Sequence, residues 1–175
     1  MPEGWSQSRD LAKLAEARAQ FDLSIPLGDL PGIPAEFSAA DRPVRSWLQF
    51  GREQGLPVVQ IRLSATLKAA CQRCLGEMQL ELGAESRLAI VDSEAQAGSV
   101  PEELETFLAP DGYATLAALV AEELLLALPL VPRHAAGERC QVAPEAELHR
   151  PGAPVPEETQ RPFADLRSLL DLDRK

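Results

Sequence analysis

The sequence predicts an α+β fold in which an antiparallel β-sheet packs against one buried helix. Apolar and polar residues alternate over about 58–90, with an interruption at residues 71–74, and this period is typical of strands with one buried face. Residues 114–128 are apolar around much of a helical circumference, so this helix must be covered on more than one side. With 175 residues, 45% of them apolar, the chain can form one domain with a substantial core.

The segments before and after the long hairpin are assigned from local patterns. Residues 8–20 hold Leu11 and Leu14 among good helix formers, which predicts a short N-terminal helix. The remaining expectations are strands at 21–25, 44–50 and 104–108, a turn at 51–57 and a polar loop at 92–101.

The register of the hairpin is predicted from the apolar positions. If the chain folds back between Gln72 and Arg73, Leu67 lies opposite Met78, and Lys68 lies opposite Glu77. The same register places Ala65 opposite Leu80, Leu63 opposite Leu82 and Ile61 opposite Ala84. A slip of one residue would place apolar side chains opposite polar ones, so the pattern excludes it.

The predicted domain organisation is one α+β domain over 1–140, a linker over 141–160 and a C-terminal amphipathic helix over 161–175. The linker is rich in proline and glutamate and offers little to a core. The terminal segment places Phe163, Leu166 and Leu169 on one helical face. This helix is expected either to dock on its own domain or to bind a partner.

Charge separates the two parts of the chain. The formal net charge is −10; residues 1–100 carry 10 basic and 13 acidic side chains, and residues 101–175 carry 7 and 14. An acidic second half argues against nucleic acid wrapping around it and fits a basic protein partner, or solubility alone. Four basic residues around the hairpin could contact RNA, although interspersed glutamates favour a mixed solvated face: Arg62, Lys68, Arg73 and Arg87.

The pair Cys71-Gln72-Arg73-Cys74 has three interpretations. It could be a redox dithiol, although such pairs usually lie at a helix N-terminus and strands flank this one. It could be half of a structural zinc site, completed by His134 and Cys140. It could also be two small, partly buried residues without a metal, and the last two interpretations stay open. Three cysteines and no signal-peptide pattern lead us to expect a soluble protein of the reducing cytoplasm.

We expect no enzyme. The sequence has no glycine-rich phosphate loop, no H-E-x-x-H and no motif that pairs a nucleophile with a base. Glu122 and Glu123 are adjacent, and adjacent side chains diverge by about 100° around a helix. A solvated edge of the helix is therefore expected there.

Three motifs occur together in this chain. They are Cys71-Gln-Arg-Cys74-Leu75 after an alternating strand, Glu122-Glu-Leu-Leu-Leu-Ala-Leu-Pro-Leu-Val-Pro132 followed by His134 and Cys140, and Arg161-Pro-Phe163-Ala-x-Leu166-x-x-Leu169. With these motifs in this order, the chain resembles the large ribosomal RNA subunit accumulation protein family (YceD). The resemblance covers nearly the whole chain.

The resemblance implies a non-enzymatic bacterial factor of ribosome biogenesis, needed for accumulation of large-subunit ribosomal RNA. It also implies a second C-x-x-C pair after the helix in many relatives, where this chain has only His134 and Cys140. We expect binding to a basic ribosomal protein or an assembling large subunit, through Arg73 and the terminal residues Phe163, Leu166 and Leu169. The alternatives are direct binding of ribosomal RNA at the hairpin tip, or a thiol redox protein. The expected cofactor is none, or one structural zinc on Cys71, Cys74, His134 and Cys140.

Overall fold

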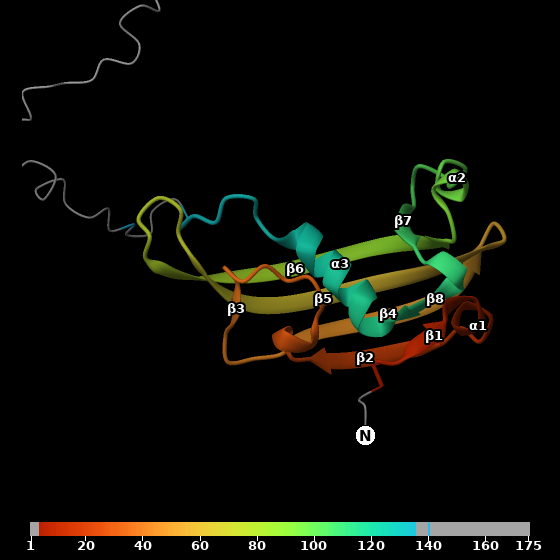
Figure 1. Cartoon of the computed structure of the whole chain (residues 1–175), viewed down its shortest axis with the longest axis horizontal. Coiled ribbons are helices and arrows are strands. Elements are labelled where there is room, and N and C mark those ends of the chain that lie inside the picture. Colours follow the sequence, from red (N-terminus) through yellow and green to blue (C-terminus); the bar gives the residue numbers. More distant parts are fainter. Residues whose placement is uncertain (1–3, 136–139, 141–175) are drawn as a thin grey trace, which may run out of the picture. The chain divides into compact units, whose positions relative to one another are not determined.

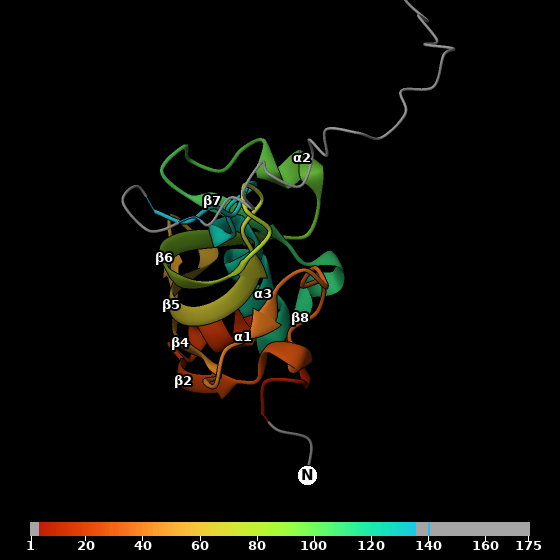
Figure 2. The same ribbon diagram turned by 90° about the vertical axis from the view of Figure 1, so that its left-hand side faces the viewer.

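A curved β-sheet wraps around one long helix, and this arrangement confirms the predicted α+β class. The computed structural model describes residues 4–135 and 140. The linker expected at 141–160 and the helix expected at 161–175 lie outside these residues, so the predicted domain organisation stays a prediction. In Figure 1 the helix α3 crosses one face of the sheet, and Figure 2 shows the strands forming an arc around it.

The main sheet has the order β2-β4-β5-β6-β7, with the short β3 paired to β5, and β1 pairs with β8 in a second sheet. The strands are β1 (Ser8–Asp10), β2 (Gln20–Ile25), β3 (Ser38–Ala39), β4 (Val44–Glu53), β5 (Leu56–Ala70), β6 (Glu77–Val91), β7 (Glu105–Leu108) and β8 (Tyr113–Thr115). The helices are α1 (Leu11–Glu16), α2 (Glu94–Ala97) and α3 (Leu116–Ala127), with 3-10 turns η1 (Leu27–Asp29) and η2 (Pro110–Gly112). All pairings are antiparallel except β6 with β7, which is parallel.

The hairpin of β5 and β6 exists as predicted, but its predicted register is wrong by two residues. Leu67 lies opposite Leu80 rather than Met78, and Lys68 lies opposite Gln79. The cause is the turn, since the pair that closes it is Cys71 with Gly76, and four residues lie between them. A shift of two residues leaves every side chain on the same face, so alternation cannot exclude it. Lys68 still reaches Glu77 diagonally, at 3.4 Å.

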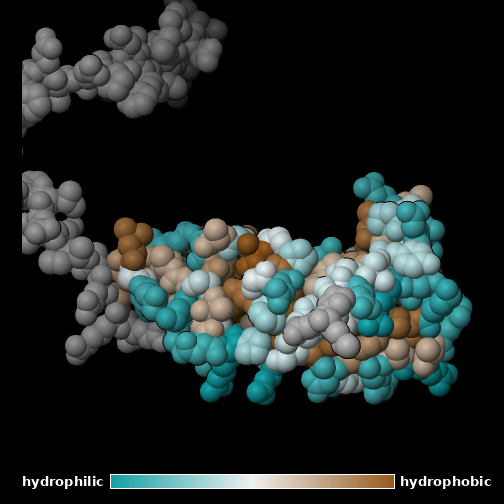
Figure 3. Space-filling view, turned by 60° about the horizontal axis from the view of Figure 1, so that its bottom comes forward, coloured by the Kyte–Doolittle hydropathy of each residue, from teal (hydrophilic) through white to brown (hydrophobic). Residues whose placement is uncertain are grey.

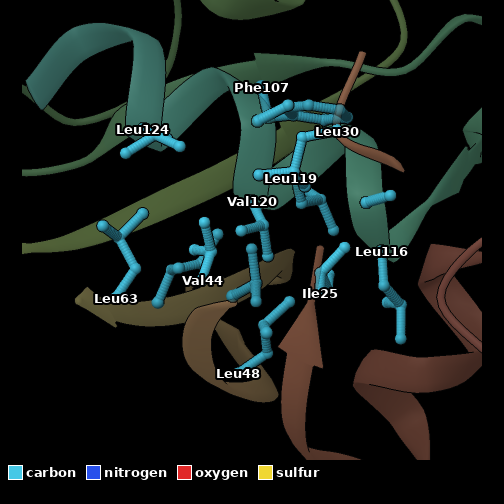
Figure 4. Close-up of a cluster of buried hydrophobic side chains, with 14 of the residues drawn as sticks. Ile25, Leu30, Val44, Leu48, Leu63, Phe107, Leu116, Leu119, Val120 and Leu124 are labelled. Carbon is cyan, nitrogen blue, oxygen red and sulfur yellow. The ribbon is translucent and has the colours of Figure 1, made fainter. Parts of the chain in front are cut away.

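The core lies between the concave face of the sheet and α3. Leu119, Val120 and Leu124 of the helix have no exposed surface, and in Figure 4 they point toward the strands that carry Val44 and Leu63. Burying an aliphatic side chain of this size stabilises the fold by about 1.5–3 kcal/mol. The helix begins later than predicted because the Thr115 side chain caps it and accepts the Ala118 N–H at 3.0 Å.

The N-terminal helix is shorter than the predicted 8–20. Residues 8–10 pair with β8, and Asp10 then caps α1 by accepting the Lys13 N–H at 3.1 Å. Arg18 has φ of +50°, a conformation that cannot continue a helix, and the chain leaves directly into β2. Tertiary pairing thus overrides the helix propensity of the flanking residues.

Two further expectations differ from the structure in their extent. The turn expected over 51–57 is only the pair Gln54-Gly55, with φ of +49° and +86°, and this pair joins β4 directly to β5. The loop expected over 92–101 contains the one-turn helix α2.

Glu123 does not lie on a solvated edge, so that expectation is wrong for one of the two glutamates. Its side chain is only 4% exposed, whereas Glu122 is exposed. The Ser86 hydroxyl on β6 donates a short hydrogen bond of 2.5 Å to the Glu123 carboxylate. Burial raises the Glu123 pKa, and this hydrogen bond offsets part of the rise.

Candidate metal centre

The tip of the β5–β6 hairpin holds two cysteines in a tight loop. The Cys71 N–H donates to the Gly76 carbonyl at 2.9 Å, and the Leu75 N–H donates to the Cys71 carbonyl at 2.8 Å. Leu75 adopts a left-handed conformation with φ of +59°, which turns the chain back toward β6. Cys71 is fully buried and Cys74 is half-buried, so both thiols lie inside the curve of the loop.

The segment after α3 returns the chain to this tip. Leu128 takes an extended conformation before Pro129, which ends the helix. The Gln72 N–H then donates to the Pro132 carbonyl at 2.9 Å, so the returning segment is attached to the loop by its backbone. This attachment brings His134, two residues further on, beside the cysteines.

Four side chains that the sequence suggested as ligands come together here: Cys71, Cys74, His134 and Cys140. Their ligand atoms all lie within 4.8 Å of one another. The sulfurs of Cys71 and Cys140 are 3.8 Å apart, and the Cys74 sulfur is 3.5 Å from His134 Nδ1. Residues separated by 60 or more positions are therefore brought together at one point, and this group could hold a metal ion.

Two of the distances among these atoms match those around a tetrahedral zinc ion. Zinc lies about 2.3 Å from sulfur and about 2.0–2.1 Å from nitrogen, so ideal tetrahedral ligands are separated by about 3.8 Å for two sulfurs and about 3.6 Å for sulfur and nitrogen. The two distances in the structure agree with these values. Three thiolates and one imidazole are a ligand set of structural zinc sites.

The surroundings of the thiols favour their ionised form at two positions. Burial opposes ionisation of Cys71, but backbone N–H groups, including that of His134, more than offset it and lower its pKa to about 5. The Arg73 guanidinium donates from Nε to the Cys140 sulfur at 3.1 Å and lowers the Cys140 pKa. The thiolate neighbours, Cys140 first, raise the pKa of His134. Thiolate is the form that binds metal.

The pKa of Cys74 moves in the opposite direction. The Gly76 N–H favours its thiolate, but the neighbouring thiolates of Cys140 and Cys71 outweigh that contact and raise the pKa. Like charges in one cluster cannot all ionise freely without a cation to balance them. A bound divalent ion would supply this balance for all three sulfurs at once.

The basic residues expected to contact RNA already have partners. Arg73 donates to Cys140, Lys68 pairs with Glu77, Arg62 pairs with Glu85 at 2.9 Å, and Arg87 pairs with Glu53. Their charges are thus largely matched within the described part of the chain. Binding of ribosomal RNA at the hairpin tip stays a prediction, and these pairs do not favour it.

The structure also exposes a group of carboxylates, here called the acidic face, that was not among the predicted sites. No lysine or arginine occurs between Arg87 and Arg133. Seven carboxylates in this stretch are exposed: Asp92, Glu94, Glu102, Glu103, Glu105, Asp111 and Glu122. None of them forms an ion pair with any residue among 4–135 and 140. A local count of charge, rather than a count by halves, would have found this stretch.

Among the described residues the most exposed large apolar side chain is Leu130, at 98%, and the adjacent Val131 is also exposed. Leu75 at the hairpin tip is 80% exposed, Leu126 on α3 is 75% exposed, and Leu108 on the edge strand β7 is 46% exposed. Figure 3 shows one face, on which apolar surface occurs as separate areas among hydrophilic ones. Within 4–135, no helix is long and apolar enough to cross a membrane.

Comparison with known proteins gives one consistent result. Residues 59–170 match the model of the family described as large ribosomal RNA subunit accumulation protein YceD. A protein of that name from Haemophilus influenzae is 32% identical over 120 residues, which are 66% of this chain and 67% of the relative. No solved structure matches the chain. Because the family model spans more than half of the sequence and includes the hairpin, α3 and all four candidate ligands, the chain belongs to the YceD family of large ribosomal RNA subunit accumulation proteins.

Proposed function

We propose that this protein is a non-enzymatic assembly factor of the large ribosomal subunit, which binds a basic ribosomal protein through its acidic face. The family name associates such proteins with accumulation of large-subunit ribosomal RNA and names no reaction. The observation that carries the proposal is the set of seven exposed, unpaired carboxylates on one stretch of the described chain. Unpaired charge of one sign attracts and orients a partner of the opposite sign.

The elements that carry these carboxylates also offer a place for backbone contacts. Glu102, Glu103 and Glu105 lead into and begin β7, the last strand in the described order of the main sheet. An edge strand can accept a further strand from a partner, and Leu108 supplies an exposed apolar contact beside it. A basic, extended segment of a ribosomal protein has the matching chemistry. The terminal residues Phe163, Leu166 and Leu169 would add a second contact.

We further propose that Cys71, Cys74, His134 and Cys140 bind one structural zinc. The agreement of two of their distances with those around a tetrahedral ion supports this proposal. The ion would fix the segment after α3 to the hairpin tip, since two ligands come from each. It would thereby stabilise the domain rather than take part in a reaction.

The partner proposal is tested by charge reversal. Glu102, Glu103 and Glu105 are changed together to lysine, and the control changes three exposed carboxylates elsewhere, Glu16, Asp29 and Glu36. Both variants have the same net charge, so a loss confined to the first localises the contact. The measurement is binding of purified basic large-subunit proteins, together with the level of large-subunit ribosomal RNA in cells that depend on each variant.

Equal binding by the two variants would refute the acidic-face contact. Removal of residues 141–175 tests the terminal contact separately. If that truncated chain binds as well as the full chain, Phe163, Leu166 and Leu169 do not contribute.

A further inference from the structure

We infer that Cys140 and Cys71 form a site of reversible thiol oxidation, at which a hydroperoxide converts the pair to a disulfide. This inference goes beyond ribosomal assembly and concerns a modification of the cysteine cluster. The thiol pair stands on its own geometry, and only its consequence for the ion rests on the proposed zinc. The inference follows from the position, exposure and neighbours of the two sulfurs.

The two sulfurs are close enough to join without rearrangement of the fold. They are 3.8 Å apart, and a disulfide bond is about 2.05 Å long, so side-chain rotation has to close less than roughly 2 Å. The thiols also differ in access. Cys71 is fully buried, whereas Cys140 is half-buried, so an oxidant in solution meets Cys140 first. The buried thiol then lies ready as the second partner.

Arg73 favours Cys140 as the first thiol to react. Its Nε–H donates to the Cys140 sulfur at 3.1 Å, and this contact holds the more accessible sulfur in place at the hairpin tip. Arg73 therefore has a role that its position in the C-x-x-C loop alone did not suggest.

The chemistry balances with a hydroperoxide as the oxidant. The Cys140 thiolate attacks one peroxide oxygen, an S–O bond forms, the O–O bond breaks, and the leaving hydroxide or alkoxide takes up a proton. The Cys71 thiolate then attacks the Cys140 sulfur of this sulfenic acid. An S–S bond forms, the S–O bond breaks, and hydroxide leaves as water. Two thiols are oxidised and one peroxide is reduced.

The product has a definite structural consequence. A disulfide between Cys71 and Cys140 removes two of four ligands, and Cys74 and His134 alone do not make a structural zinc site. The backbone hydrogen bond from Gln72 to Pro132 involves neither sulfur, so the segment after α3 stays attached to the hairpin when the disulfide forms. Oxidation should therefore release the ion while the fold remains. A Cys71–Cys74 disulfide would lie within one loop and would not bridge these segments.

The test uses the full chain, loaded with zinc and treated with hydrogen peroxide. The expected result is a cross-link between the peptides that carry Cys71 and Cys140, with loss of about 2 Da that dithiothreitol reverses. A chromogenic chelator should report one zinc released per cross-link. The Cys74→Ser variant should keep the cross-link, Cys140→Ser should lose it, and Arg73→Ala should slow its formation.

The same treatment is applied to chelator-stripped protein, which separates the two proposals. A cross-link in the stripped protein would support the thiol pair independently of zinc, and failure of the full chain to take up zinc would refute the zinc proposal alone. Two results would overturn the thiol pair. One is a cross-link that joins Cys71 to Cys74 instead, and the other is oxidation of Cys140 to sulfinic acid without a cross-link. Circular dichroism of each variant identifies any that fail to fold, and the wild-type peptide map does not depend on them.

Discussion

Removal of one ligand should abolish stabilisation by zinc, and the chain contains its own control. It has two histidines, of which His134 lies in the cluster and His149 lies outside the described residues. The four ligand atoms already lie within 4.8 Å of one another, so the ion needs little rearrangement of the folded chain. An ion that binds only the folded state stabilises it by about 2.7 kcal/mol at a free concentration 100 times its dissociation constant.

For a chain of this length, each kcal/mol shifts the melting temperature by about 2–4 °C, so the expected shift is roughly 5–11 °C. Thermal unfolding is followed by circular dichroism in a chelator and then with buffered free zinc. Wild type and His149→Ala should both show the shift, whereas His134→Ala should lose most of it. Equal melting temperatures with zinc and with chelator in the wild type would refute the zinc centre. An undiminished shift in His134→Ala would remove His134 from the ligand set.

Three further predictions concern the fold. Leu124→Ala should lower the free energy of unfolding by about 2–5 kcal/mol because Leu124 is fully buried. The control Leu126→Ala, on the exposed side of the same helix, should change it by less than about 0.5 kcal/mol. Urea denaturation measures both. Burial raises the pKa of Glu123 in the native state, so the native state binds this proton more tightly than the unfolded chain does. The free energy of unfolding therefore falls as the pH rises from the unfolded pKa near 4.5 through the native pKa. Glu123→Gln should therefore raise the melting temperature at pH 7, with a gain that shrinks toward pH 4; a gain independent of pH would contradict this reasoning. Gly55→Ala should cost about 1–2 kcal/mol because φ is +86° there, whereas Gly51→Ala, with open space around its Cβ, should not destabilise the protein in the same denaturation assay.

The cysteine cluster connects the tip of the β5–β6 hairpin to the segment that follows α3. The hairpin tip, which holds two of the thiols, extends beyond the end of α3, and the chain that follows α3 runs toward this tip (Figure 1). The backbone hydrogen bond between Gln72 and Pro132 attaches it there. The contact of Arg73 with Cys140 adds a side-chain link from the same loop. Metal affinity and thiol reactivity would therefore both depend on this single turn.

The buried Glu123 shows how tertiary contacts alter a simple helical pattern. Seen on the helix alone, adjacent glutamates mark a polar edge, and Glu122 follows that rule. Glu123 instead faces β6, where Ser86 interrupts the apolar face of the strand and donates to it. The serine occupies a core-facing position in the alternating pattern, and this was the only sequence signal of the contact.

The sequence by itself determined which residues face the core, because side chains alternate along a strand and repeat every 3.6 residues along a helix. That was sufficient for the long hairpin and for α3, whereas Cys71, Cys74, His134 and Cys140 were candidate ligands because of their residue types. It could not determine the register, since a shift of two residues preserves every face and only the hydrogen bonds of the turn decide between the two. Nor could it bring Cys140 within 3.8 Å of Cys71, because the folded path after α3 sets that distance.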